Sequence, residues 1–342
     1  MPSPSAVTLP LIDDLHVHLR QGAMMGLVAP TVRGGGVGRV LVMPNLTPPI
    51  TSVAMAKAYR AELQKIDSEI DYLMTLFLSP AIAPEDLRNA RSEANVVGLK
   101  SYPKGVTTGS DSGVENYEIY FPIFAEMEKL GLSLHLHGEL PNTCVMKAEE
   151  LFLTHLSRIH GAFPNLKIVL EHVTSAAAIQ AVLACGPSVA ATITIHHLDL
   201  TISDVVGNNT NFCKPVAKLD SDRAAIRAIV ASGNPKFFFG SDSAPHPVGD
   251  KTKACCAPAG IFTQPWIALY LADAFERLGC LDKLEDFACN FGARFLRLQH
   301  KTEPKIQLAK VPFQVPSTFG SVGGPFTVIP FRAGETLRYS FA

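Results

Sequence analysis

The sequence predicts a (β/α)8 barrel, an α/β fold of eight parallel strands alternating with eight helices, followed by an irregular C-terminal extension. Eight short apolar segments alternate along the chain with longer amphipathic segments. The 342 residues suit one barrel domain, a fold that takes roughly 200 to 400 residues. A composition with 47% hydrophobic and only 18% charged residues favours a large buried core.

The predicted strands are short apolar runs. Several of them, such as VGRVLVM and KFFFG, are almost continuously apolar. Parallel strands covered by helices on both faces have this character. We expect strands at 11–18, 39–44, 71–78, 96–102, 132–137, 167–172, 190–198 and 236–241, the seventh of them ending in the pair His196 and His197.

The predicted helices lie between these strands and are bounded by typical start and stop residues. A helix over 53–66 follows Ser52, and one over 117–130 stops at Gly131. The others are expected at 85–93, 147–159, 176–185, 222–231, 265–278 and 284–296. A doubly wound open sheet is the alternative, but it usually has fewer strands and a GxGxxG turn, which this sequence lacks.

No linker interrupts the alternation, so we expect one barrel domain over 1–300. The remaining segment, 301–342, is rich in Pro, Gly and Phe and shows no helical period. It is therefore expected to pack on the barrel as an extension.

Composition argues against several classes of function. Thirty Lys and Arg against 31 Asp and Glu leave no basic excess for nucleic acid. The first residues lack the basic and apolar parts of a signal peptide, and no apolar window is long enough to span a membrane. The seven cysteines, scattered apart from the adjacent Cys255 and Cys256, contain no CxxC pair and indicate reduced thiols and a cytoplasmic location.

Potential metal ligands follow the predicted strands at the end where barrel enzymes place their active sites. His16 and His18 are two residues apart, so both rings point into the barrel. His137, His172 and Asp242 end three further strands. Imidazole and carboxylate ligands suit zinc, which keeps an open position in catalytic sites. A single histidine would be read as a packed residue, but this set predicts a metal site.

Lys100 lies in the otherwise apolar strand VVGLKSYP. Burying an ammonium group is costly, so such a lysine tends to lose its proton or to find an anionic partner. A neutral amine there could form a Schiff base, or it could take up carbon dioxide and present a carbamate to two metals. Pairing with a nearby carboxylate is the third reading.

The motifs HVHLR, MPN, GLKSYP, LHLHGE, LEHVT and GSDSAPH occur in this order, and the late segment VIPFRAGETLRY follows them. This series resembles the amidohydrolase superfamily, and within it the dihydroorotases of the non-fused (class II) type. The resemblance runs from about residue 11 to about residue 293.

The resemblance implies a site with two Zn²⁺ per subunit. His16, His18 and Asp242 would hold one metal, and His137 and His172 the other. Carboxylated Lys100 would bridge them together with a hydroxide. The implied reaction is the reversible cyclisation of N-carbamoyl-L-aspartate to L-dihydroorotate in pyrimidine biosynthesis, with Asp242 as the catalytic proton shuttle.

The resemblance also implies the substrate contacts. Arg20, Asn45 and His246 match the family's binders of the substrate carboxylate, and Ala259 and Gly260 align with backbone groups near the ring. The polar segment 103–114 corresponds to a lid, in which Thr107 and Thr108 reach the substrate. The family further suggests a homodimer.

Two competing readings remain open. A hydantoinase or allantoinase would share the metal pattern but bind the ring substituents differently, and Arg20 with Asn45 favours a substrate that has a free carboxylate. A non-catalytic barrel derived from an amidohydrolase would be expected to have lost ligands. Every predicted ligand position is occupied by a suitable residue, and metal analysis would separate the two cases.

Overall fold

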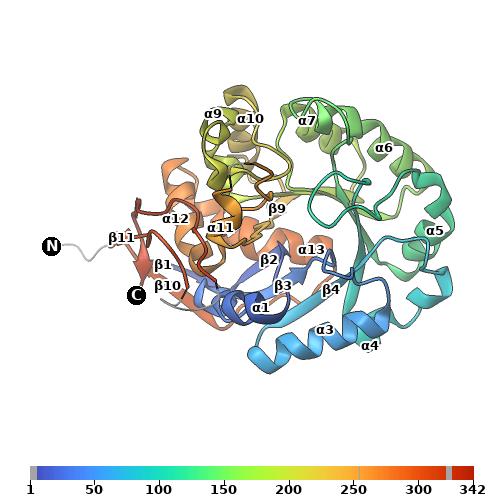
Figure 1. Ribbon diagram of the computed structural model, residues 1–342, viewed down its shortest axis with the longest axis horizontal. Coiled ribbons are helices and arrows are strands. Elements are labelled where there is room, and N and C mark those ends of the chain that lie inside the picture. Colours follow the sequence, from blue (N-terminus) through green and yellow to red (C-terminus); the bar gives the residue numbers. More distant parts are fainter. Residues whose placement is uncertain (1–5, 254, 321–325) are drawn as a thin grey trace.

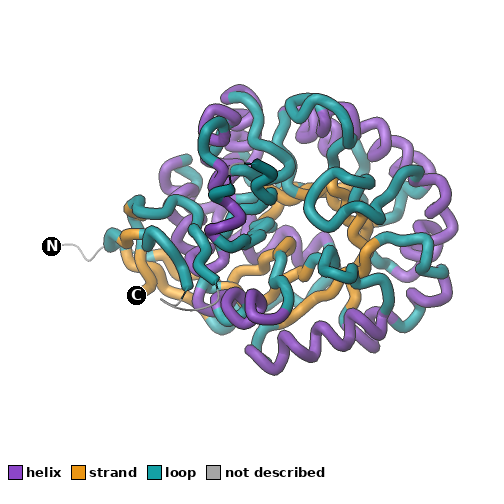
Figure 2. Tube along the Cα trace, in the orientation of Figure 1, coloured by secondary structure: helices purple, strands orange, loops and turns teal. Residues whose placement is uncertain are grey.

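The computed structural model describes residues 6–253, 255–320 and 326–342, and it shows a barrel of eight parallel strands surrounded by helices (Figures 1 and 2). The strands pair in sequence order and have these bounds: β2 (Ile12–Val17), β3 (Val37–Val42), β4 (Asp71–Phe77), β5 (Val96–Ser101), β6 (Ser133–His137), β7 (Lys167–Glu171), β8 (Val189–Ile193) and β9 (Phe237–Phe239). The predicted fold class is confirmed.

The barrel closes between its first and last strands just beyond β9. Val17 and Ser243 form a parallel bridge. The Asp242 amide donates to the His16 carbonyl over 2.9 Å, and the His18 amide donates to Ser243 over 3.0 Å. This closure brings the predicted ligands of β2 beside Asp242.

Thirteen α-helices lie in the described part of the chain, most of them in the connections between strands, as Figure 1 shows. Their bounds are α1 (Gly22–Val28), α2 (Thr31–Gly34), α3 (Val53–Ile66), α4 (Ala90–Ala94), α5 (Phe121–Leu130), α6 (Ala148–Ala162), α7 (Ala176–Ala184), α8 (Ile195–Asp199), α9 (Ile202–Val205), α10 (Asp220–Ala231), α11 (Val248–Lys251), α12 (Ile267–Arg277) and α13 (Phe291–Phe295). Short helical turns cover 84–87, 117–120, 209–211, 264–266 and 281–283, and a π-helical turn covers 286–290. None of the helices in these ranges has the length and apolar character that a membrane span needs.

The core has two parts. A larger cluster fills the space between the strands and the outer helices, where Leu134, Leu136 and Phe152 are fully buried. A smaller cluster, including Leu15 and Phe238, fills the barrel interior away from the predicted site. Side chains therefore plug one end of the barrel, while the polar residues occupy the other.

The seventh strand is shorter than predicted. It ends at Ile193, and His196 and His197 belong to α8 instead of to the strand. The Thr194 hydroxyl caps this helix by accepting from the His197 amide over 3.0 Å. The run ITIHHL shows neither the period of a strand nor that of a helix. The capping hydroxyl of Thr194 therefore decides that a turn of helix begins here.

The C-terminal segment contains short strands that the sequence did not predict. Strand β10 (Lys305–Ala309) pairs with β1 (Val7–Pro10) and with β13 (Ser340–Phe341), and β11 (Phe313–Gln314) pairs with β12 (Thr336–Leu337). The N-terminal strand β1 thus shares a sheet with the extension, beside the barrel in Figure 1. The division of the chain at residue 300 stays a prediction.

Candidate active site

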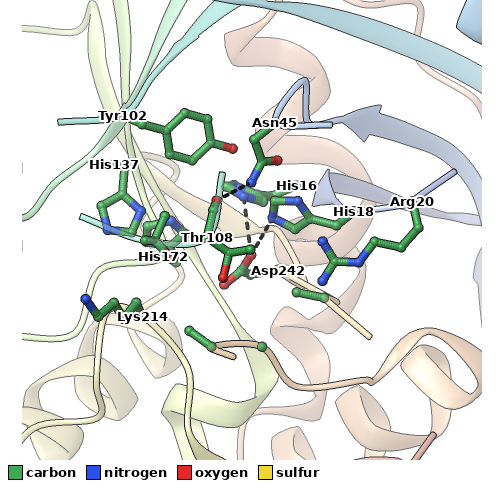
Figure 3. A pocket seen from close by; sticks show the side chains of 14 residues that line it. His16, His18, Arg20, Asn45, Tyr102, Thr108, His137, His172, Lys214 and Asp242 are labelled. Atoms are coloured by element: carbon green, nitrogen blue, oxygen red, sulfur yellow. Dashed lines mark hydrogen bonds and ion pairs between the residues drawn. The ribbon is translucent and has the colours of Figure 1, made fainter. Parts of the chain in front are cut away.

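A narrow cavity lies at the carboxyl ends of the barrel strands (Figure 3). It is lined by His16, His18, Arg20, Asn45, Tyr102, Thr107, Thr108, His137, His172, Lys214, Asp242, Ala244, Ala259 and Gly260. Of the residues predicted from the sequence, Lys100 and His246 are not part of this lining. The structure thus gathers side chains from most of the chain length into one site.

His16, His18 and Asp242 form one half of the site. Asp242 Oδ1 lies 3.0 Å from His18 Nε2 and 3.4 Å from His16 Nε2. The three side chains are buried, and their ligand atoms lie within 4.8 Å of one another, a group that could hold a metal ion. Burial lowers the pKa of His18 to about 4, so the ring is neutral and has a lone pair for a metal.

Asp242 is ionised in spite of its burial. Burial alone would raise its pKa, but the hydrogen bond from His18 and the nearby His16 bring the pKa well below its usual range. This half of the site therefore combines the neutral imidazole of His18 with an anionic carboxylate, the protonation states that metal ligation requires.

His137, His172 and Lys100 form the other half. The His137 and His172 rings lie 4.8 Å apart between centroids, and His172 lies 5.0 Å from the His16 ring. Burial lowers the pKa of His137 below its usual range, and that of His172 well below it. The two halves are thus adjacent and form one cluster of buried imidazoles.

Lys100 is fully buried, and burial lowers its pKa to about 8. Among the described residues, neither Lys100 Nζ nor His172 Nδ1 has a hydrogen-bond partner. An unpaired buried nitrogen is costly, so both atoms fit a site that is completed by bound metal and a modified lysine.

Two buried carboxylates, to which the sequence analysis assigned no role, support the histidines. Glu171 accepts from His16 Nδ1 over 2.8 Å, and it also contacts His135 Nδ1 and Thr192 Oγ1, each at 2.5 Å. Because His16 Nδ1 faces Glu171, Nε2 is left to face Asp242. Asp14 accepts from the Ser241 backbone amide over 2.7 Å and from the Ser241 hydroxyl over 2.6 Å. Asp14 shares a strand face with His16 and His18, and this period of two was the available signal.

Three residues that follow strands at the site have a left-handed backbone conformation, which residues other than glycine rarely adopt. Arg20, His172 and Asp242 have φ of 62°, 42° and 46°. Left-handed conformations of this kind cost free energy and persist where the surrounding structure fixes them. They direct three functional side chains toward the cavity.

Arg20 gives the cavity a positively charged edge, and His246 contacts this side chain from just outside the lining. Arg20 Nη2 lies 3.0 Å from His246 Nε2, and Arg20 Nε donates to the Pro245 carbonyl over 2.9 Å. His246 also contacts the Ala259 carbonyl at 3.0 Å. Burial lowers the pKa of Arg20 to about 10, so the guanidinium stays charged and suits a carboxylate.

The segment 103–114, which we call the lid segment, contributes Thr107 and Thr108 to the lining of the cavity. Asn45 Nδ2 donates to the Thr108 carbonyl over 3.1 Å, whereas Asn45 Oδ1 is buried without a partner among the described residues. The structure therefore places Asn45 against the lid segment as well as in the cavity.

A second group with metal-binding residue types lies nearby. It consists of His196, His197 and Cys213, all buried. Both ring nitrogens of His197 have ordinary partners, Thr194 Oγ1 at 2.9 Å and the Pro215 carbonyl at 3.0 Å, and the Cys213 thiol donates to the same carbonyl over 3.3 Å. These contacts fix the segment around Pro215 to α8, which accounts for the pair His197 and Cys213.

Comparisons with known proteins converge on one group. The amidohydrolase family model matches residues 70–273. The probable dihydroorotase of Schizosaccharomyces pombe is 49% identical over 339 residues, covering 98% of each chain, and the dihydroorotase of Saccharomyces cerevisiae is 41% identical, covering 98% of this chain and 97% of the relative. The crystal structure of the S. cerevisiae dihydroorotase with 5-fluoroorotic acid superposes with a TM-score of 0.94 over 98% of each chain, at 40% identity. An L-hydantoinase from Arthrobacter aurescens has a TM-score of 0.77 at 17% identity, which shows a shared fold alone.

Proposed function

The chain belongs to the dihydroorotase family of the amidohydrolases, and from this premise we propose that it cyclises N-carbamoyl-L-aspartate to L-dihydroorotate, reversibly, as a step of pyrimidine biosynthesis. The observation that carries the proposal is the cavity itself. It unites a cluster of buried imidazoles around Asp242 with the charged guanidinium of Arg20, which His246 contacts. A substrate with a cyclic amide and a free carboxylate needs both parts.

The amidohydrolase family implies a metal cofactor, and we propose two zinc ions per subunit. His16, His18 and Asp242 would hold one, His137 and His172 the other, and carboxylated Lys100 would join them. The chemistry that bound zinc supplies is activation of a water molecule and polarisation of the amide carbonyl. Asp14 and Glu171 orient the ligands.

In the direction of ring opening, Asp242 accepts a proton from the attacking water. It then gives this proton to the ring nitrogen that leaves as the C–N bond of the amide breaks. In the biosynthetic direction the same carboxylate takes the proton from the ureido nitrogen as the C–N bond forms, and gives it to the oxygen that leaves the carboxyl carbon. The position of Asp242 Oδ1 between His16 and His18 holds it at the reacting centre throughout.

The other cavity residues bind and enclose the substrate. The guanidinium of Arg20 pairs with the ring carboxylate, with His246 and Asn45 beside it, and the backbone of Ala259 and Gly260 faces the ring. Thr107 and Thr108 close over the substrate from the lid segment and exclude water.

The direct test is ring opening of L-dihydroorotate by the purified, zinc-replete protein, followed by the loss of its ultraviolet absorbance. We expect turnover, and Asp242→Asn should remove it. Absence of turnover with about two zinc ions bound per chain would redirect the proposal to a hydantoinase-like substrate. Absence of both turnover and metal would support a non-catalytic barrel.

We further propose that the enzyme works in the cytoplasm as a homodimer. All seven cysteines are free thiols, as expected in a reducing compartment. Sedimentation equilibrium of the full chain would measure the oligomeric state, and a single species with the mass of one chain would contradict the dimer.

A further inference from the structure

The lid segment is attached to the rest of the molecule by very few polar contacts. Among residues 6–253, 255–320 and 326–342, two hydrogen bonds join positions 103–113 to side chains beyond the neighbouring residues 102 and 114–115. One is the bond from Asn45 Nδ2 to the Thr108 carbonyl. The other is a bond of 2.7 Å from Lys214 Nζ to the Val106 carbonyl. The remaining bonds of the segment stay within 102–115.

Lys214 reaches the lid segment from a fixed position. Its neighbours Cys213 and Pro215 are buried, and the Pro215 carbonyl accepts from both His197 and Cys213. Lys214 itself lines the cavity, as Figure 3 shows. The contacts that hold the group of His197 and Cys213 together therefore also fix the base of the lysine side chain.

The bond from Lys214 is charge-assisted and only half exposed. Hydrogen bonds from an ammonium group are stronger than those between neutral groups, and partial burial reduces competition from water. Its acceptor, Val106, directly precedes Thr107. A bond at this place therefore sets the position of the two threonines that face the cavity.

We propose that Lys214 is a positioning residue that holds the lid segment closed over the active site and thereby strengthens substrate binding. The effect on substrate binding rests on the proposed function. The effect on the position of the lid segment does not, because the bond from Lys214 forms in the absence of substrate. Asn45, just beyond β3, also holds the lid segment through the Thr108 carbonyl, so loss of Lys214 loosens one of two attachments.

The test uses Lys214→Met, which keeps the aliphatic stem and removes the ammonium group. Hydrogen exchange of the substrate-free protein, read by mass spectrometry on the peptide that covers 103–114, should be several-fold faster than in the wild type. The value of kcat/KM should fall about tenfold in both directions, mainly through a higher KM, because closure is coupled to binding. Metal content should be unchanged, and Lys214→Arg should restore much of the protection.

Lys236→Met is the matched control. Lys236 Nζ also donates to two backbone carbonyls, those of Val182 and Cys185, but at the amino end of β9. Its loss should leave lid exchange and KM unchanged. Unaltered lid exchange in Lys214→Met, or equal acceleration in Lys236→Met, would overturn the proposal. If the wild type does not open L-dihydroorotate, the proposed function fails, whereas the exchange experiment still decides the role of Lys214.

Discussion

The metal-binding rim and the lid segment face the same cavity but are built in opposite ways. The rim residues His16, His137 and His172 are almost fully buried at the ends of paired strands. The lid segment is largely exposed, with Lys104, Thr108 and Asp111 open to solvent, and two side-chain hydrogen bonds tie it to the barrel among the described residues.

The difference separates two tasks. Metal ligands must be held to within a fraction of an ångström, which strand ends backed by Glu171 and Asp14 can provide. A lid must open to admit substrate, so its closed state can be only modestly favoured. Changes to the rim should therefore alter metal content and chemistry, and changes to the lid segment should alter binding and turnover at constant metal content.

Lys100→Ala should have the largest effect. It removes the buried nitrogen proposed to join the two metals, so turnover should fall to background and bound zinc should fall below two ions per chain. Zinc analysis and the ring-opening assay measure both quantities. Lys104→Ala, four residues further on and exposed, is the control that should leave zinc unchanged. Full activity of Lys100→Ala would contradict a bridging role.

The double variant Thr107→Ala with Thr108→Ala tests the other side of the comparison. Both side chains line the cavity, and their loss should reduce turnover by about a hundredfold through misplacement of the substrate. Zinc content should stay at the wild-type value, because the hydrogen bonds of these two residues in the described part of the chain go to Asn45 and Ser110 and not to the proposed ligands. Unchanged turnover would show that the lid segment does not contribute to the reaction.

Glu171→Gln should weaken the rim without removing a ligand. An amide cannot accept from His16, His135 and Thr192 as a carboxylate does, so the orientation of His16 becomes less fixed. We expect a loss of about 10- to 100-fold in zinc affinity or activity. Competition with a chelator measures the affinity. An affinity equal to that of the wild type would show that strand packing alone orients His16.

The barrel could be predicted because its strands are buried on both faces, which leaves apolar runs such as KFFFG in the sequence. The seventh strand was predicted too long because a single capping residue, Thr194, ends it. Strands β10 to β13 escaped prediction because two to five residues are too few to show a period of two, and their partners lie far away in sequence, as β1 does for β10.

The residues of the site likewise fall into those that the sequence could predict and those that it could not. His16 and His18 could be recognised because their spacing places both rings on one face of one strand. Glu171 and Lys214 could not, because their roles depend on partners from distant segments, Thr192 and His16 in one case and Val106 in the other. A residue type shows what chemistry is possible, whereas only the fold shows what it contacts.

The smallest effect we predict concerns stability at the rim. Glu149 of α6 is buried and accepts from the Thr174 amide over 2.9 Å, two residues beyond His172. Burial raises its pKa from 4.5 to about 7, although Lys218 opposes the shift. Between these values the folded protein keeps a proton that the unfolded chain has released, so this group lowers the free energy of unfolding as pH rises.

Glu149→Gln cannot ionise and should escape this loss. The free energy of unfolding of the variant, relative to the wild type, should therefore rise between pH 5 and pH 8, by on the order of 1 to 3 kcal/mol. Urea unfolding followed by the fluorescence of Trp266 at each pH gives the difference, and effects of pH on the metal ligands, which are shared, cancel in it. Parallel pH profiles would mean that Glu149 is ionised in the folded protein throughout. The Thr174 amide would then donate to a charged carboxylate, and this charge would help to stabilise the rim.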